Sequence, residues 1–353
     1  MIYFLLAFFL SIILAWFVKK VALKLKITDI PDNKRKKHKK ETALLGGIAI
    51  FLSFWSVICY LLMFTNKIGK HVSYIQLLII FISSLILVVL GVLDDKYDLS
   101  AKFRLVAYVL VVLFTILFAI DLDGITNPLG GIIKLDSWKW SLTGFESLIL
   151  VGDLVVFFWL LGMVHTAKVL DGLDGLTTGI IGIGATVIYF LASSAKFYQS
   201  DVRIIALVLA GTCFGFLLLN FYPAKIYLGE SGGLFLGFML GILAVIAGGK
   251  IATALLVMAV PILDFAWVIY KRFTTKQSVF TGDRKHLHYR LVDSGFSVRQ
   301  SVVFLYLVSF GFGISTLVLP SKFKILILVL LAVLFLVLER YIVKKRSYKY
   351  GSN

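Results

Sequence analysis

Three carboxylates at the end of an apolar run are the first candidates for chemistry in this sequence. Asp94, Asp95 and Asp98 follow the stretch "LILVVLGVL", although the chain has only 19 acidic residues among 353. In a helix, residues 94 and 98 would lie one turn apart, and residues 95 and 98 would share a face. Like charges at such distances raise one another's pKa unless a cation lies among them. The stretch therefore predicts a site for a metal ion or a basic partner, or else three acids exposed to water.

Two more carboxylates and two glycines form a second cluster in the segment "KVLDGLDG" (168–175). Asp171 and Asp174 are three residues apart, and Gly172 and Gly175 would let a ligand approach the backbone closely. Alternatively, Asp174 is the N-cap of the helix that follows. The cluster therefore predicts either a ligand-binding loop or a capped turn.

A third segment, "FYPAKIYLGESGG" (221–233), places a glycine-rich turn before a helix. The free N–H groups and the dipole at a helix start make a cradle for phosphate, and Glu230 could hold a metal ion there. Gly232 belongs to the same turn and is a candidate contact to substrate. A glycine hinge is the alternative, because it would have the same sequence.

The segment "GDRKHLHYR" (282–290) gathers basic groups and imidazoles. Such groups bind a diphosphate or stabilise a leaving phosphate. The alternative is a basic loop that only orients the chain in a membrane. No spacing of Cys and His in the chain resembles a zinc site. The candidates in this segment are Arg284, Lys285, His286, His288 and Arg290.

The composition indicates what kind of protein positions these clusters. Hydrophobic residues make up 60% of the chain and charged residues 16%, with a mean hydropathy of +0.97. Soluble domains are about 45–50% apolar and about 25% charged. Successive apolar stretches of about 17–21 residues match a hydrocarbon core of ~30 Å at a rise of ~1.5 Å per helical residue. The sequence therefore predicts an all-α polytopic membrane protein.

Eleven transmembrane helices are expected. The first is not a cleavable signal peptide, because no basic residue precedes it and Lys19 and Lys20 follow it. That flank places the amino terminus outside and the carboxyl terminus in the cytoplasm. The cytoplasmic segments then hold 27 of the 36 Lys and Arg residues and the external segments the other nine, in agreement with the positive-inside rule. The expected spans are residues 2–18, 44–64, 74–93, 104–120, 147–164, 176–195, 203–220, 233–247, 251–270, 302–319 and 323–342.

All four polar clusters fall on the cytoplasmic side of this topology. A transporter or channel would place polar groups near the midplane or on both faces. One-sided clustering favours an enzyme at the membrane interface, with acids for a divalent ion such as Mg²⁺ and basic groups for phosphate, and this combination suits phosphoryl transfer involving a lipid. Residues 1–353 are expected to form one domain with active-site loops at 19–43, 94–103, 165–175, 221–232 and 271–301.

Three further charged features lie outside these clusters. The net charge of +17 and the run "KRKKHKK" (34–40) fit orientation and attraction to anionic lipids, or contact with a phosphorylated substrate, rather than nucleic-acid binding. Asp153 lies near an external helix end, where it is expected to be solvated. Asp264 follows Pro261 by about one turn, and we expect it to bind freed backbone groups or a basic residue of a neighbouring helix.

The four motifs, in this order and orientation, resemble the polyprenyl-phosphate N-acetylhexosamine-1-phosphate transferases, the bacterial WecA and MraY group. The resemblance begins at "DIPDNKRKKH" (29–38) and "GGIAI" (46–50) and runs over nearly the whole chain. It implies that an oxygen of undecaprenyl phosphate attacks the β-phosphorus of a UDP-sugar and UMP leaves, with Mg²⁺, or Mn²⁺ in its place, required. The segment "HLHYR" (286–290) is closer to the WecA-type loop, which favours UDP-N-acetylglucosamine.

Several positions depart from the family pattern. The family usually has Asn at the positions of His165 and Lys168, Asp at that of Glu230, and His at that of Tyr289. Glu keeps the type of metal ligand, whereas a protonated Lys cannot ligate Mg²⁺. The metal site is therefore expected to be shifted, weakened or partly replaced by the ammonium group. An unusual sugar substrate or an inactive scaffold are the alternatives to transfer of N-acetylglucosamine phosphate.

The resemblance and the chemistry together assign an expected role to each candidate. Asp94 would orient or deprotonate the lipid phosphate, and the expected catalytic set is Asp94, Asp95, Asp98, Asp171 and Asp174. The expected metal ligands are Asp95, Asp174 and Glu230. The expected substrate-binding residues are Lys168, His286, His288, Arg284, Arg290 and Gly232.

Lys168 and Glu230 are also expected to contact each other. Unit charges 4 Å apart attract by about 4 kcal/mol at an effective dielectric of ~20, so the ammonium group would bind the carboxylate directly. The resemblance alone further implies a homodimer in the membrane.

Overall fold

The structure is a computed structural model of the 353-residue chain. It describes residues 1–29, 41–120, 122, 124–127, 132–135, 139–140, 148–248, 250–278, 285–320, 323–324, 326–333, 335 and 337.

The described residues are mostly helical. Two of the long helices begin with capping boxes, in which Ser73 or Ser297 accepts an N–H three residues on while Gln76 or Gln300 accepts the serine N–H. The helices are α1 (Ile2–Lys24), α2 (Gly46–Phe64), α3 (Tyr74–Tyr97), α4 (Ala101–Ala119), α5 (Leu150–Leu170), α6 (Leu176–Ser193), α7 (Ser200–Asn220), α8 (Gly229–Ile246), α9 (Ile251–Val257), α10 (Ala259–Thr274), α11 (Leu287–Asp293) and α12 (Val298–Val318).

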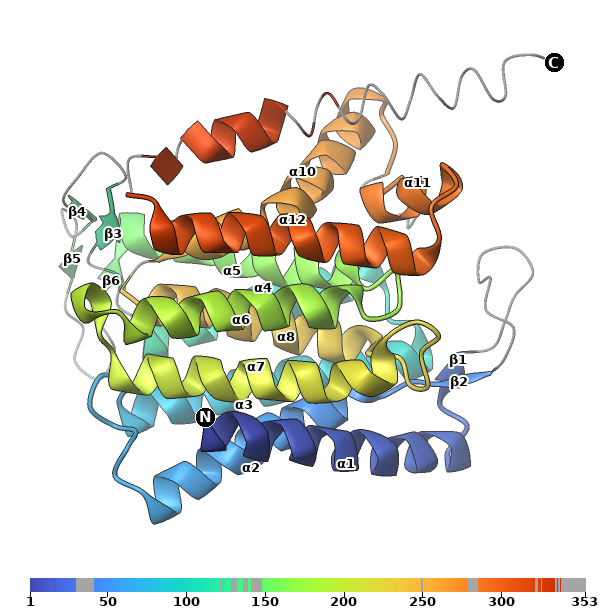
Figure 1. Ribbon diagram of the computed structural model, residues 1–353, viewed down its shortest axis with the longest axis horizontal. Helices are drawn as coiled ribbons and strands as arrows, with labels where there is room; N and C mark the ends of the chain where they lie inside the picture. Colours follow the sequence, from blue (N-terminus) through green and yellow to red (C-terminus); the bar gives the residue numbers. More distant parts are fainter. Residues whose placement is uncertain are drawn as a thin grey trace.

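Three short antiparallel strand pairs connect the helices. β1 (Thr28–Asp29) pairs with β2 (Thr42–Ala43) between α1 and α2. β3 (Gly124–Thr126) pairs with β4 (Ile132–Lys134), and β5 (Lys139–Trp140) with β6 (Leu148–Ile149), all between α4 and α5. The pair β1–β2 lies at one end of the helix bundle, and the two pairs between α4 and α5 lie at the other end (Figure 1).

The expected membrane architecture is confirmed in its main features. In the described part of the chain, nine helices, α1 to α8 and α12, are long and apolar enough to cross a membrane. The expected span 251–270 corresponds to α9 and α10, which meet at a bend of 81° and add a tenth span only if the bent pair crosses the membrane as one. The expected span 323–342 lies partly outside the described residues.

The long helices lie roughly parallel, and successive helices run in opposite directions (Figure 1). The amino terminus and β3 to β6 therefore lie at one end of the bundle. The carboxyl ends of α3, α5 and α7, the amino ends of α4, α6 and α8, and α11 lie at the other end. All four polar clusters of the sequence thus meet at one end of the bundle.

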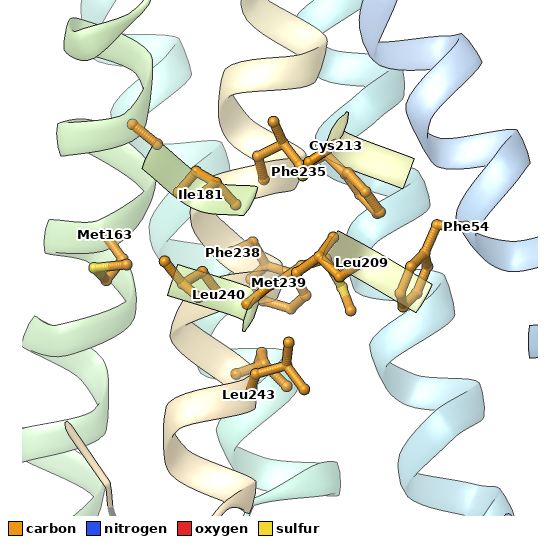
Figure 2. Close-up of a cluster of buried hydrophobic side chains, with 14 of the residues drawn as sticks. Phe54, Met163, Ile181, Leu209, Cys213, Phe235, Phe238, Met239, Leu240 and Leu243 are labelled. Atoms are coloured by element: carbon orange, nitrogen blue, oxygen red, sulfur yellow. The ribbon is translucent and has the colours of Figure 1, made fainter. Parts of the chain in front are cut away.

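Helix α8 forms the centre of the bundle, with 89% of its residues buried inside the protein. Figure 2 shows side chains of α8, such as Phe235, Phe238 and Leu240, packed between the helices that carry Met163 and Phe54. Phe235 makes edge contacts with Phe54 at 5.8 Å between ring centroids. Burial of such side chains against other helices fixes α8, and therefore Glu230 in its first turn, relative to the rest of the bundle.

Asp201 fastens the loop between α2 and α3 to the first turn of α7. Its Oδ2 accepts N–H groups from four successive residues, Gly69 to Val72, at 2.8 to 3.1 Å. The Ser200 hydroxyl donates to the other carboxylate oxygen at 2.7 Å. Asp201 is fully buried, so the hydrogen bonds replace the water that its charge has lost.

We expect Asp201→Ala to lower the stability of the folded protein by at least ~2 kcal/mol, since hydrogen bonds to a charged group contribute about 1.5–3 kcal/mol each. Asp201→Asn keeps an acceptor oxygen without the charge, so its stability should lie between that of the alanine variant and that of the wild type. Thermal unfolding of the purified protein in detergent measures both. An unchanged unfolding midpoint for the alanine variant would contradict this role.

Candidate active site

Asp94 is held by two basic side chains at the end of α3. Arg104, in the first turn of α4, brings its Nη1 to 2.9 and 2.7 Å from the two carboxylate oxygens. The N–H of Leu99 donates to Oδ1 at 2.9 Å, and Lys168 Nζ lies 3.6 Å from Oδ2. Asp94 is only 5% exposed. The basic partner predicted for the acidic stretch is therefore present.

Asp95 binds the amino end of α8. Its Oδ1 accepts the N–H of Glu230 at 3.0 Å, and the N–H of Ser231 also binds this carboxylate. Gly229 has a φ of +72°, and a Cβ there would lie 2.7 Å from Asp95 Oδ2, so glycine suits this position in both conformation and space. The expected phosphate cradle at this helix start is thus occupied by Asp95, which corrects the prediction.

Asp98 does not join its two neighbours. Helix α3 ends at Tyr97, and Asp98 is an exposed C-cap with a left-handed φ of 47°. The expectation that Asp98 shares a helical face with Asp94 and Asp95 is therefore wrong, because the helix ends one residue too early.

Lys168 links two of the expected clusters. From the last turn of α5, its Nζ lies 2.9 Å from Glu230 Oε2 and 3.6 Å from Asp94 Oδ2. The predicted ion pair between Lys168 and Glu230 is confirmed. The same ammonium group lies 5.9 Å from the centre of the Tyr108 ring.

The two aspartates of the loop between α5 and α6 have different surroundings. Burial, and then the charges of Glu230, Asp95 and Asp174, raise the pKa of Asp171 well above its ordinary value. Asp174 accepts the N–H of Ala224 at 2.8 Å, whereas Gly175 is the N-cap of α6. The alternative prediction that Asp174 caps α6 is therefore wrong, and the residue instead ties its loop to the segment before α8.

Helix α11 brings the histidine segment to this loop. The His286 and His288 rings are stacked, with centroids 5.9 Å apart and planes 4° apart. A methyl group on Gly172 would overlap His288 Nε2 and the Tyr289 hydroxyl, so the two segments touch at this glycine. The fourth cluster is therefore in contact with the second.

Three candidates remain: the expected substrate contacts Arg284 and Gly232, and the basic residue Lys285. Arg284 lies outside the described residues. Lys285 is exposed, and its Nζ donates to Gln277 Oε1 at 2.6 Å. Gly232 is buried inside α8, where a Cβ would overlap the Leu228 side chain and lie 3.0 Å from the Cα of Gly47. Gly232 thus serves helix packing rather than facing the carboxylates.

Arg104 and Tyr108 belong to the site but were not among the residues predicted from sequence. Arg104 follows Asp94 by ten residues, across a short turn, so only the pairing of α3 with α4 brings the two together. The Tyr108 hydroxyl is buried without a hydrogen-bond partner in the described structure, and its ring meets that of His165 at 5.6 Å. The available signal was a basic residue in the first turn of the helix after an acidic stretch, with a hydroxyl residue one turn later.

Around Asp94 and Glu230 the site holds more carboxyl groups than cations. Arg104 and Lys168 pair with Asp94 and Glu230, and the carboxyl groups of Asp95, Asp171 and Asp174 lie close enough to this group to interact with it electrostatically. Within the described residues, no group of three or more His, Cys, Asp or Glu side chains is arranged to hold a metal ion. Asp95 Oδ2 is buried with no hydrogen-bond partner in that part of the chain. A hard oxygen of this kind fits a divalent cation that brings ligands of its own.

We expect Asp171→Asn to stabilise the protein at neutral pH. The pKa of Asp171 in the folded state lies above the value of about 4 of an unfolded aspartate, so the folded state binds more protons between these values. The stability of the wild type therefore falls as the pH rises through this interval, and asparagine removes the fall. Thermal unfolding between pH 4 and neutral pH, measured for both proteins, tests it. Identical pH dependence would contradict the raised pKa.

Known proteins are similar in sequence to this chain over most of its length. The family described as "Glycosyl transferase family 4" matches residues 77–248. The chain is 32% identical over 311 residues to a probable undecaprenyl-phosphate N-acetylglucosaminyl 1-phosphate transferase of Bacillus subtilis, covering 86% of this chain and 80% of that protein.

Two further relatives have related names. An undecaprenyl-phosphate alpha-N-acetylglucosaminyl 1-phosphate transferase of Yersinia pestis is 28% identical, covering 86% of this chain and 79% of that protein. A decaprenyl-phosphate N-acetylglucosaminephosphotransferase of Mycobacterium leprae is 29% identical, covering 78% of this chain and 73% of that protein. The chain therefore belongs to the polyprenyl-phosphate N-acetylhexosamine-1-phosphate transferases, the phosphoglycosyl transferases of glycosyl transferase family 4 that include WecA and MraY.

Proposed function

We propose that this protein transfers N-acetylglucosamine 1-phosphate from UDP-N-acetylglucosamine to undecaprenyl phosphate at the cytoplasmic face of a bacterial inner membrane. An oxygen of the lipid phosphate forms a bond to the β-phosphorus, and the bond from that phosphorus to the UMP oxygen breaks. UMP leaves, and a lipid-diphosphate sugar remains for synthesis of cell-envelope polysaccharide. The names of the relatives and the gathering of acids, Lys168 and Arg104 at one end of the bundle support this proposal.

The observation that carries the proposal is the arrangement around Asp94. Arg104 and Lys168 supply two positive charges beside one carboxylate, at the end of helices that cross the membrane. A lipid phosphate arriving at the interface would find both cations within reach, and Asp94 would accept its proton if the phosphate is protonated. Positioned charges of this kind are the main contribution that proteins make to phosphoryl transfer.

His286, His288 and Arg290 form the basic side of the site, on the segment that touches Gly172. All three are buried, with exposures of 8% or less. Basic groups held in this way would bind the diphosphate of the nucleotide and stabilise the charge that UMP carries away.

We propose a magnesium ion on the acidic side, with phosphate oxygens of the nucleotide among its ligands, because the described carboxylates are not arranged to hold a metal ion by themselves. Asp95, Glu230 and Asp174 would hold it, and it would supply positive charge to the diphosphate. Lys168 already neutralises Glu230, so we propose that Lys168 would turn from Glu230 to a phosphate oxygen when the nucleotide binds, which would free Glu230 for a cation carried by the diphosphate. Metal binding should therefore be weak without nucleotide and strong with it.

Purified protein assayed with undecaprenyl phosphate, Mg²⁺ and a panel of UDP-sugars tests the function. We expect UMP release and a lipid-diphosphate sugar with UDP-N-acetylglucosamine. A different preferred sugar would change the donor only, and binding without turnover would indicate a scaffold. Solute flux in proteoliposomes without transfer would overturn the proposal in favour of a transporter.

We expect Asp94→Asn and Asp95→Asn each to reduce turnover at least ~10²-fold, the low end for loss of a general base. Asp94→Asn would lose the negative charge that pairs with Arg104 and accepts the proton, and Asp95→Asn would lose the charge at the start of α8. Asp98→Asn is the matched control, because Asp98 is exposed and lies beyond the end of α3, and it should cost less. Near-native rates in either of the first two variants would place the chemistry elsewhere.

Lys168→Asn should retain activity and tighten Mg²⁺ binding, because it removes the ammonium group that now occupies Glu230. Glu230→Gln should lose most turnover, because an amide pairs with the ammonium group and binds the cation less strongly than a carboxylate does. Turnover as a function of Mg²⁺ concentration gives both results. If Lys168→Asn abolishes activity without a gain in Mg²⁺ affinity, the lysine has a catalytic role of its own and this account of the site fails.

A further inference from the structure

Asp264 is a buried carboxylate to which the reaction described above gives no role. It lies on α10 and is 4% exposed. Its Oδ2 lies 2.9 Å from His286 Nδ1, and its Oδ1 accepts the N–H of Leu287 at 2.9 Å. Arg290 Nη2 lies 3.4 Å from Oδ1. A buried carboxylate needs such donors to offset its lost hydration, and all three come from one short segment.

The same contacts hold α11 in place. This helix has only seven residues, and His286, its N-cap, makes no side-chain capping bond. A helix this short is not stable by itself. Asp264 accepts the N–H of Leu287, one of the groups that a helix start leaves without an internal partner. The position and direction of α11 therefore depend on a side chain from another helix.

Asp264 also determines which ring nitrogen of His286 carries a proton. An ionised carboxylate only accepts hydrogen bonds, so the Nδ1 that lies 2.9 Å away must be the donor. In an imidazole ring, Nε2 then points away from Asp264. The ring lies parallel to that of His288, which touches Gly172 beside Asp171. The chain of contacts thus runs from Asp264 to the loop of the carboxylate cluster.

We propose that Asp264 is a positioning residue: it keeps the proton of His286 on Nδ1 and holds α11 so that His286 Nε2 faces a phosphate group of the nucleotide. The role in transfer rests on the function proposed above, whereas the state of the ring does not. The bend between α9 and α10 turns α10 away from the axis of the bundle (Figure 1), and Asp264 on α10 contacts the start of α11.

The ring state is measured by ¹⁵N NMR of histidine-labelled protein in detergent, at a pH at which the imidazole is neutral. The chain has only five histidines, so His286→Gln identifies the signal. We expect the proton of His286 on Nδ1 in the wild type. In Asp264→Asn the amide can donate to Nδ1, which moves the ring proton to Nε2, as happens when the aspartate of a serine-protease triad is replaced. A wild-type proton on Nε2 overturns the inference without any variant.

Kinetics then test the role in transfer. We expect Asp264→Asn to lower kcat/KM for the nucleotide about 10- to 100-fold, by analogy with the effect of replacing the carboxylate behind a metal-ligating histidine. Asp264→Glu should recover much of this loss, because it keeps the charged acceptor. A stable Asp264→Asn protein with wild-type kcat/KM overturns the inference.

Asp293→Asn is the matched control, since Asp293 lies at the far end of α11, and it should change neither the ring signal nor kcat/KM. If the wild type transfers no sugar phosphate but His286 carries its proton on Nδ1 and loses it in Asp264→Asn, the positioning stands and the proposed function fails. If the wild type is active while Asp264→Asn keeps both ring signal and rate, the positioning fails and the function stands.

Discussion

The ammonium group of Lys168 lies between carboxylates of two other helices, and the rest of the site depends on it. Glu230 and Asp94 approach it to 2.9 and 3.6 Å. Without a cation between them, like charges a few ångströms apart would repel by several kcal/mol at an effective dielectric of ~20. With Lys168 and Arg104 in place, the carboxyl end of α3 and the amino end of α8 can lie against each other.

The site also uses the partial charges at helix ends. Asp95 lies at the carboxyl end of its own helix, where the dipole disfavours a negative charge. The amino end of α8 compensates by donating the N–H groups of Glu230 and Ser231. One oxygen of Asp95 is thereby committed to the protein, and the other is buried without a hydrogen-bond partner among the described residues. Adjacent aspartates, identical in type, therefore have distinct partners: side-chain cations for Asp94 and backbone N–H groups for Asp95.

The helical architecture and the gathering of four motifs could be predicted from sequence. The lengths of the apolar stretches and the distribution of Lys and Arg among the loops are both properties of local sequence. The pairing of Lys168 with Glu230 was also predictable, since the resemblance placed both at one point. The contact of Arg104 with Asp94 was not, because it depends on how α4 turns back against α3. The end of α3 before Asp98, and the use of the α8 start by Asp95 rather than by phosphate, likewise depend on tertiary contacts. The bend between α9 and α10 was not predicted either, because the segment contains no glycine to mark it and Pro261 lies inside α10, after the bend.

Helix α8 has a consequence for how the protein is made. It is among the least apolar of the long helices and the most buried, and it carries five glycines, Gly229, Gly232, Gly233, Gly237 and Gly241. For a segment that contacts protein instead of lipid, close packing against neighbouring helices matters more than high hydrophobicity. Such a segment gains little from entering the bilayer alone, so its insertion during synthesis should depend on α2, α3 and α5 having already entered. The order of synthesis supplies these helices first, and the catalytic end is completed only when α8 enters between them.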